Sequence, residues 1–222
     1  MNSIVRESSS SEKKAEHVRI FQQIGGWAGI LAPIVFTALV IIESLLRPGY
    51  SQIYGYISDL GVGPYSLIQN SNFVIFGCLS FLFALGFGKT LNSVSGKRAR
   101  VVTALIITFG LGSIFAGVSL LFSAYFAHLL STFIAFGAAM AAQFLSWRSL
   151  INSNGMKWGS YRLYSLISGL LSVILFFVFL YTITAFPYLS TTTYHGLAER
   201  MFVAVPLLWM IVSGVKILRA EL

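Results

Sequence analysis

The sequence predicts an all-α fold: a bundle of six transmembrane helices, with the N- and C-termini in the cytoplasm. Three observations predict it. Of the 222 residues, 56% are hydrophobic and 10% are charged, whereas soluble domains carry about 25% charged residues. Six long apolar runs follow one another along the chain, and the basic residues fall almost entirely in alternate connections between them. Because so few charges cannot cover a water-facing surface, lipid is the expected solvent.

The first residues differ in composition from the rest of the chain. They are rich in serine and in charged side chains, and such a segment cannot bury enough apolar surface to offset the entropy lost on ordering. We therefore expect residues 1–19 to form a disordered cytoplasmic tail. Residues 20–222 are expected to form a single six-helix membrane domain, because this length leaves no room for a second folded domain.

Each apolar run has the length of one membrane crossing. About 20 residues of helix cross a hydrocarbon core about 30 Å thick. Lipid offers no hydrogen bonds to the backbone, so a spanning segment has to be helical. The predicted spans lie near residues 24–46, 70–91, 101–123, 128–147, 163–186 and 198–218.

The connections between the runs predict the orientation. The stretches 92–100 and 148–162 are basic, and basic loops stay in the cytoplasm. On this assignment Arg47 and Arg200 are the only outer residues among the 15 lysines and arginines. The chain is expected in the plasma membrane with both termini inside. The net charge of +8 follows from this asymmetry, and no nucleic-acid partner is predicted.

Small residues predict where the helices pack closely, because small side chains let helix backbones approach one another. Gly25 and Gly29 form such a pair in the first span. The fourth span carries Ala135, Ala138, Ala139 and Ala142 and is expected at the centre of the bundle. The phenylalanine-rich fifth span is expected to face lipid. Cys78 is expected to be a small buried hydrophobic residue.

Most ionisable residues that the topology does not explain lie at the outer end. Ionisable groups at membrane depth are costly and mark functional sites, so this cluster is the candidate ligand site. Glu43 and Arg47 are four residues apart, which favours an ion pair along one helix face. The candidate ligand-binding residues are Glu43, Arg47, Ser58, Asp59, Asn72, His128, His195, Glu199 and Arg200.

The first outer connection carries a helical pattern followed by a glycine-rich turn. Tyr50, Ile53, Tyr54 and Ile57 have the spacing of a short amphipathic helix lying at the membrane surface. Ser58 and Asp59 then precede the turn. Two readings stay open for them: the carboxylate lies over the bundle mouth as part of a site, or both side chains cap the turn.

The sixth run begins with a second polar group. His195 and Glu199 are four residues apart and can share a face. Pairing of Glu199 with Arg47 or Arg200 in a structural ion pair is the favoured interpretation. Together with Asp59 and His128, these residues have the donor atoms of a metal site such as zinc. The two outer histidines also suit haem, but no cofactor is predicted from such weak spacing.

Several short motifs carry a family resemblance: Pro48-Gly49-Tyr50-Ser51, Ile57-Ser58-Asp59-Leu60-Gly61 with Pro64, Asn72, and Gly196-Leu197-Ala198-Glu199-Arg200 leading to Trp209. With them the chain resembles the prokaryotic membrane family called domain of unknown function nine-nine-eight, over residues 20–219. The Ile57–Asp59 stretch is more distantly similar to the damage-regulated autophagy modulators and to proteins that remodel glycosylphosphatidylinositol lipid. The resemblance implies six helices and contact with lipid head groups.

Two functions follow as hypotheses. In the first, the outer cluster of a non-enzymatic membrane protein binds a lipid head group, a small solute or a partner protein, with Arg47 and Arg200 holding phosphate or carboxylate. In the alternative, an intramembrane lipid hydrolase activates water at the same cluster through a metal or a general base. The first is favoured, because no complete catalytic set is visible. Membrane lipid is the expected partner, and a homo-oligomer or a membrane-protein partner is a further option.

Overall fold

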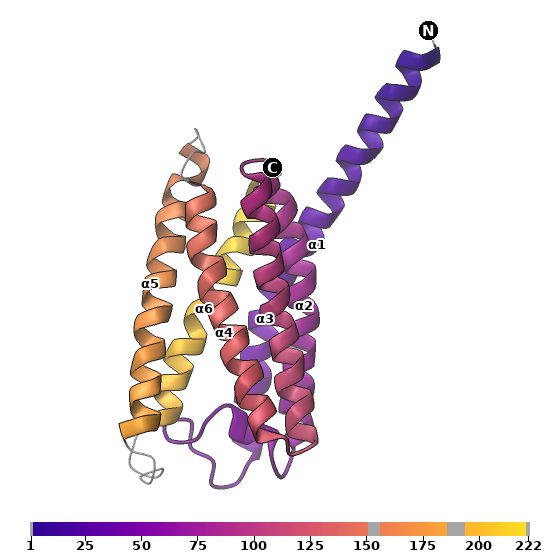
Figure 1. The fold of residues 1–222 in the computed structure, drawn as a ribbon. Helices are drawn as coiled ribbons and strands as arrows, with labels where there is room; N and C mark the ends of the chain where they lie inside the picture. Colours follow the sequence, from indigo (N-terminus) through magenta and orange to yellow (C-terminus); the bar gives the residue numbers. More distant parts are fainter. Residues whose placement is uncertain (1, 151–155, 186–193, 221–222) are drawn as a thin grey trace.

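The computed structural model describes residues 2–150, 156–185 and 194–220, and this part of the chain is a helical bundle (Figure 1). One short 3-10 turn, η1, joins the first two helices. The elements are α1 (Asn2–Leu46), η1 (Ser58–Gly61), α2 (Ser66–Asn92), α3 (Gly96–Leu121), α4 (Tyr125–Ser149), α5 (Met156–Ala185) and α6 (His195–Ala220).

Each of these six helices is long and apolar enough to cross a membrane. The predicted all-α, six-span class is therefore confirmed. The ends of α1 and α6 near the two termini lie at the same end of the bundle (Figure 1). We call the opposite end, where η1 lies, the outer end. Its placement outside the cell, and the choice of membrane, stay predictions from the distribution of charge.

The first helix is longer than the span predicted for it. Residues 2–19 continue α1 and project away from the bundle (Figure 1). The predicted disorder of residues 1–19, and the division into a tail and a membrane domain, stay predictions. Residue 186, at which the fifth span was expected to end, lies outside the described residues.

The helices pack as a ring in chain order. Each helix packs against the helix before it and the helix after it, and α1 closes the ring against α6. Across the middle, α6 also contacts α2 and α4. Within the spans, 56% of both α2 and α6 is buried, against 33% of α4 and 17% of α5. The lipid-facing position expected for α5 agrees with this.

The central position expected for the fourth helix is wrong. Only 33% of the α4 span is buried. Ala135 packs closely against α3, since a Cβ atom on Gly112 of α3 would lie 2.6 Å from the Cβ of Ala135. The residues of α6, at the centre of the described bundle, are larger. A run of alanines therefore indicates a close contact but not a central place.

Glycines also set the contacts of α1. A Cβ atom on Gly25 would lie 2.5 Å from the Cα of Gly86 in α2, and one on Gly214 of α6 would lie 2.5 Å from the carbonyl oxygen of Gly26. The packing role predicted for Gly25 is thus confirmed. Both contacts lie toward the termini, so α1 is held closest to its neighbours in the inner half of the bundle.

Cys78 is not buried, contrary to the expectation from its apolar surroundings. It is exposed on α2, while the neighbouring Gly77 faces the backbone of α3. Successive residues of a helix point in different directions, and in a membrane both the lipid face and the core are apolar. Hydrophobic neighbours therefore do not distinguish the two positions.

Candidate functional site

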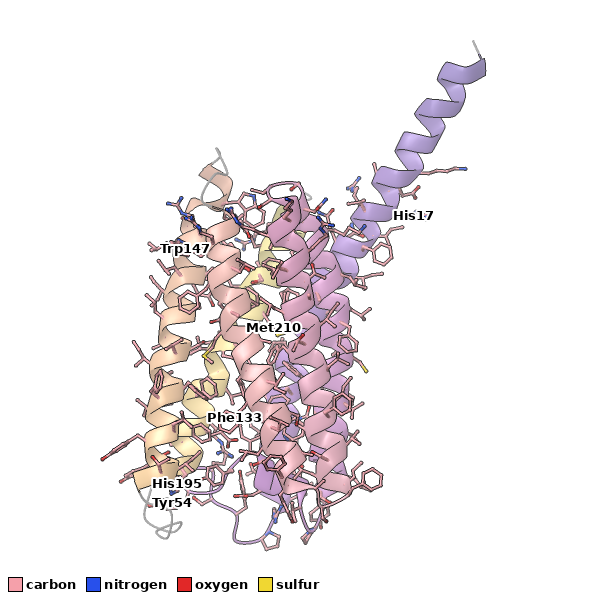
Figure 2. The ribbon with its side chains drawn as sticks, viewed as in Figure 1. His17, Tyr54, Phe133, Trp147, His195 and Met210 are labelled. Carbon is pink, nitrogen blue, oxygen red and sulfur yellow. The ribbon has the colours of Figure 1, made fainter. Side chains whose placement is uncertain are left out.

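The outer end of the bundle is covered by residues 47–65, which we call the first loop. His195 and Tyr54 lie at this end, far from Trp147 and His17 (Figure 2). The amphipathic helix expected over Tyr50–Ile57 is wrong, because this stretch is a series of turns that leads into η1. Side chains donate hydrogen bonds to loop carbonyl groups, which in a helix would accept from the backbone.

Arg200 and Tyr50 hold the loop in place. The Nη1 atom of Arg200 donates to the carbonyl oxygens of Gly55 and Gly196, both at 2.9 Å. Its Nη2 atom donates to the Tyr50 hydroxyl, and the guanidinium lies 5.8 Å from the centre of the Tyr50 ring. The Tyr50 hydroxyl in turn lies 2.7 Å from the carbonyl oxygen of Tyr56, to which it donates.

The two loop tyrosines are neutral at physiological pH. Burial raises the pKa of Tyr50 above its usual 10.0, although the hydrogen bond and the charge of Arg200 oppose this. Burial also raises the pKa of Tyr56, and the charges of Glu199 and Asp59 add to the effect. Each phenol therefore keeps its proton, and Tyr50 can donate to the loop while it accepts from Arg200.

Glu199 ties the start of α6 to the first loop. Its Oε2 atom accepts a hydrogen bond from the backbone N–H of Ile57. The N–H of Leu197 donates to the carbonyl oxygen of Ile53 at 3.0 Å. The direct ion pair expected between Glu199 and Arg47 or Arg200 is not formed among the described residues, since Arg200 donates to the loop instead. A backbone amide takes its place.

The expected pair of Glu43 and Arg47 is not formed either. Arg47 donates from Nη1 to the backbone carbonyl of Asp59. Glu43 is fully buried, and neither of its oxygens has a hydrogen-bond partner in the described part of the chain. The backbone N–H of Gln69 faces this carboxylate without reaching ordinary hydrogen-bond geometry. Asn72, also fully buried, donates to the carbonyl of Phe36 at 3.0 Å.

Asp59 caps the turn before η1. Its Oδ2 atom accepts from the backbone N–H of Tyr56 at 2.8 Å, which fits the capping interpretation. The side chain is exposed on one side and shielded by the loop on the other. This partial loss of water raises the pKa of Asp59 above 3.8. The hydrogen bond from Tyr56 and the charges of Arg47 and Arg200 lower the pKa, but by less.

Three hollows open around the loop, and they divide the predicted residues among them. The α1–α6 groove, of about 660 Å³, has Arg200 at its polar end. The Arg47 recess, of about 500 Å³, is lined by Arg47, Asp59, Tyr50 and Tyr125 with neighbouring backbone. The aromatic pocket, of about 230 Å³, lies between α4, α5 and α6. Glu43, Asn72 and His195 line none of these three.

The α1–α6 groove has apolar walls and a polar end. Its walls come from residues 33–41 of α1 and residues 203–211 of α6, and Gln52, Ile57 and Arg200 close its outer end. Ile34, Ile41 and Leu208 line the groove and are also about half exposed on the outside of the bundle. The groove is therefore open sideways toward lipid.

The aromatic pocket gathers three of the predicted residues from separate elements: Ser58, His128 and Glu199. The Nδ1 atom of His128 lies 2.9 Å from the carbonyl oxygen of Ala116. A carbonyl can only accept, so Nδ1 carries a proton, and in the neutral ring Nε2 remains an acceptor. Apart from Thr132, the other walls are aromatic or aliphatic: Tyr56, Leu129, Phe133, Phe136, Phe176, Phe179, Ile183 and Phe202.

His195 lies apart from these groups. It is buried, its ring centre lies 5.6 Å from that of Tyr56, and its Nδ1 atom has no hydrogen-bond partner among the described residues. Across those residues no three histidine, cysteine, aspartate or glutamate side chains are grouped to hold a metal ion. Asp59, His128, His195 and Glu199 therefore do not meet at one point there.

Two residues of the site were missed by sequence reasoning as site residues. Tyr50 was assigned to the helix pattern and to a family motif, and Tyr56 was given no role in the site. The signal that could have found them is weak: each is a tyrosine in a turn-rich loop beside charged residues. The function of Tyr50 follows from its hydrogen bonds with Arg200 and with the backbone carbonyl of Tyr56. That of Tyr56 follows from its place in the wall of the aromatic pocket. A linear pattern contains neither.

Comparison with known proteins gives one match. Residues 30–216 match the family model described as protein of unknown function (DUF998). The matched region includes the first loop, all three hollows and the start of α6. Neither the curated proteins nor the solved structures contain a match to the chain.

Proposed function

The chain belongs to the DUF998 family of proteins of unknown function, and we propose that it is a lipid-binding membrane protein. An acidic lipid of the outer leaflet places its acyl chain in the α1–α6 groove and its head group against Arg200. One observation carries this proposal: a groove that is apolar along its length has a single fixed cation at its membrane-surface end.

The dimensions of the groove suit one leaflet. Between Arg200 and Ile211, α6 rises about 16 Å at 1.5 Å per residue. This is about half of a hydrocarbon core about 30 Å thick. An acyl chain that enters from the side therefore runs from the head-group level to the bilayer centre without leaving the groove.

The packing of α1 explains why a groove forms here. In the inner half, Gly26 and Gly214 bring α1 and α6 into backbone contact. In the outer half the wall residues are larger and the loop residue Ile57 lies between the two helices. Each helix also contains a proline near this level, Pro33 and Pro206, and proline removes a hydrogen bond from the helix ladder.

Arg200 keeps donors for a ligand while it holds the loop. Nη1 uses both of its hydrogens and Nη2 uses one, which leaves Nε–H and the second Nη2–H. These two donors lie along one side of a planar fork, the geometry that recognises phosphate or carboxylate. Gln52 at the same end donates to Ser44 at 2.8 Å and keeps its carbonyl oxygen for a hydroxyl group.

The hydrolase alternative has one favourable observation, the meeting of Ser58, His128 and Glu199 in the aromatic pocket. The alternative requires a metal or a general base to activate water. Among the described residues no three histidine, cysteine, aspartate or glutamate side chains are grouped to hold a metal ion, and Asp59 opens into the other recess. Binding is therefore the function that this arrangement supports better.

Lipid that copurifies with the protein tests the proposal. The chain is purified in mild detergent and its bound lipid is quantified by mass spectrometry. Arg200→Ala is expected to lose the acidic lipid because the head group loses its cation. Ala38→Phe is expected to lose it as well, since Ala38 lines the groove and the larger ring fills it.

The matched control is Ala104→Phe, the same substitution at an exposed position of α3 away from the groove. It is expected to retain the wild-type amount of acidic lipid. If Ala38→Phe and Ala104→Phe carry equal amounts of acidic lipid per protein, the groove is not the binding site. If Arg200→Ala retains acidic lipid that Ala38→Phe loses, the chain part of the proposal stands and the head-group part is wrong.

A further inference from the structure

We infer that the aromatic pocket between α4, α5 and α6 is a second site, which binds an organic monocation of the alkylammonium class. It is separate from the α1–α6 groove, because the two share no lining residue. Phe133 marks the pocket in the outer half of the bundle (Figure 2). The inference does not depend on the lipid proposal.

The carboxylate of Glu199 lines this pocket. Its Oε2 atom accepts from the N–H of Ile57, and no hydrogen bond joins its Oε1 atom to another described residue. The charge of Arg200 acts on this carboxylate from nearby. Arg200, the adjacent residue in sequence, lines the groove on the other side and donates to the loop. A charge in apolar surroundings is stabilised by direct pairing with an opposite charge, and a cation that enters the pocket from outside the chain would provide that pairing for Glu199.

The walls select the kind of cation. The ring of Phe202 lies 4.5 Å from that of Phe136, 5.4 Å from Phe176 and 6.1 Å from Phe179, measured between ring centres. Tyr56 continues this surface, with its ring 6.2 Å from that of Phe179. Aromatic faces attract cations, and such cages recognise alkylated ammonium groups.

The same walls disfavour a bare metal ion. Magnesium and calcium take at least six oxygen ligands, whereas the polar side chains around the pocket are Glu199, Ser58, Tyr56, Thr132 and the ring of His128. A cation that carries its own methyl groups needs few oxygen ligands and gains from contact with the rings. The volume of about 230 Å³ suits one such head group rather than a whole lipid.

A cation can reach the pocket from the side. Leu129 lines the pocket and is half exposed on the surface of α4, at the level of the outer interface. The alkylammonium group can therefore belong to a free solute or to a lipid head group of the choline type. The chemistry of recognition is the same for both sources, and the experiment below distinguishes them.

Binding of tetramethylammonium to the full-length chain tests the inference. Isothermal titration calorimetry in detergent is expected to detect saturable binding that 3,3-dimethylbutanol, the uncharged analogue of choline, does not reproduce. Glu199→Gln is expected to weaken binding tenfold or more, because the charge is lost. The substituted amide keeps an oxygen that can accept from Ile57, so this variant retains the tie to the loop.

A second pair of variants separates the rings from the charge. Phe176 lines the pocket, whereas the adjacent Phe177 does not and is 63% exposed. Phe176→Leu is expected to weaken tetramethylammonium binding by about fivefold, in line with the loss of one cation–π contact. Phe177→Leu is expected to bind as the wild type does. Each variant loses one phenyl ring, and the two positions are adjacent on α5, so the two substitutions are chemically matched.

Two bilayers identify the source of the cation. In nanodiscs of phosphatidylcholine, weaker apparent binding of tetramethylammonium than in phosphatidylglycerol nanodiscs means that a lipid head group occupies the pocket. Equal affinity in both means a free solute. The inference is overturned if tetramethylammonium does not bind, or if Glu199→Gln with a wild-type melting curve binds it with unchanged affinity. Loss of acidic lipid in Arg200→Ala has no bearing on either result.

Discussion

The carboxylate of Glu199 accepts a hydrogen bond from the backbone N–H of Ile57, across a separation of 142 residues. This contact joins the start of α6 to the first loop, and Arg200 adds its bonds to Gly55 and Tyr50 beside it. The loop is thus part of the bundle rather than a flexible connection. The same bonds hold Arg200 at the α1–α6 groove and Glu199 at the aromatic pocket.

Tyr50→Phe tests how the loop is held. The substitution keeps the ring but removes the hydroxyl that accepts from Arg200 and donates to Tyr56. We expect the free energy of unfolding to fall by about 1–2 kcal/mol, since a hydrogen bond to a charged group is lost. Hydrogen–deuterium exchange is expected to become faster at the amides of residues 50–61.

Tyr65→Phe is the control for this variant. Tyr65 lies in the same loop, is 53% exposed, and its hydroxyl makes no hydrogen bond to another described residue. Its exchange and its melting temperature are expected to stay at the wild-type values. Equal exchange rates in the Tyr50 and Tyr65 variants would mean that the hydroxyl of Tyr50 does not hold the loop.

The titration of Asp59 is expected to make the folded chain less stable as the pH rises. The pKa of Asp59 in the folded chain is raised above 3.8 by partial loss of water, so the folded state holds this proton more tightly than the unfolded state does. The resulting stability is complete below pH about 4 and is lost as the pH rises through the raised pKa. Arg47 and Arg200 reduce the shift and do not reverse it.

Asp59→Asn isolates this effect from the other titrating groups, among them Glu199, Tyr50 and Tyr56. The asparagine oxygen can still accept from the N–H of Tyr56. We expect the melting temperature of the variant, relative to that of the wild type, to rise between pH about 4 and pH about 7. A difference that stays constant over this range, or changes in the opposite direction, would contradict the assignment.

A third prediction concerns a polar network in the inner half of the bundle. Ser165 donates to the carbonyl of Gln143 at 2.9 Å and accepts from the indole N–H of Trp209 at 3.0 Å. It thereby connects α4, α5 and α6. Ser165→Ala is expected to lower the free energy of unfolding by about 1–2 kcal/mol, because hydrogen bonds between membrane helices contribute about 0.6 kcal/mol each and the indole is left unsatisfied.

Ser146→Ala is the matched control. Ser146 is equally buried, but its hydroxyl donates to Ala142 within its own helix. The stability of this variant, measured by denaturant unfolding in detergent, is expected to remain within about 0.5 kcal/mol of the wild type. If both serine variants lose the same free energy of unfolding, the interhelical hydrogen bonds of Ser165 stabilise the chain no more than the intrahelical bond of Ser146 does.

The fold class could be predicted from the sequence because membrane thickness fixes the length of a span. The helix ends could not be predicted, since α5 begins at Met156 and α2 at Ser66, several residues before the apolar runs begin. Helices continue through the interface, where polar side chains are tolerated. The place of α4 was also mistaken, because alanines record contact with one neighbour and not depth in the bundle.

The candidate site was predictable by region but not by pairing. Charge asymmetry gathers Arg47, Glu199 and Arg200 at one end, and they do lie there together. The hydrogen-bond partners differ from those that residue spacing favours. Glu199 accepts from the N–H of Ile57, and Arg47 donates to the carbonyl oxygen of Asp59. Backbone groups of a loop compete with charged side chains for these bonds, and periodicity along the chain does not report that competition.

The last prediction contrasts two glycines that face different surroundings. On Gly86 an added Cβ would lie 2.7 Å from the Cα of Gly25 and 2.7 Å from the carbonyl oxygen of Phe21. Both obstacles are backbone, so α1 and α2 would have to separate. We expect Gly86→Ala to cost about 1–3 kcal/mol, the range for overpacking in a close contact.

Gly137 is exposed on α4, and a Cβ there meets nothing within 4 Å. Because glycine in a helix interior is less favourable than alanine by about 0.5–1 kcal/mol, Gly137→Ala is expected to stabilise the chain. The same substitution thus changes stability in opposite directions at two helical sites. Unfolding of both variants in detergent measures the difference. A loss of stability at Gly137 as large as that at Gly86 would mean that the close contact between α1 and α2 is not what makes Gly86 sensitive to substitution.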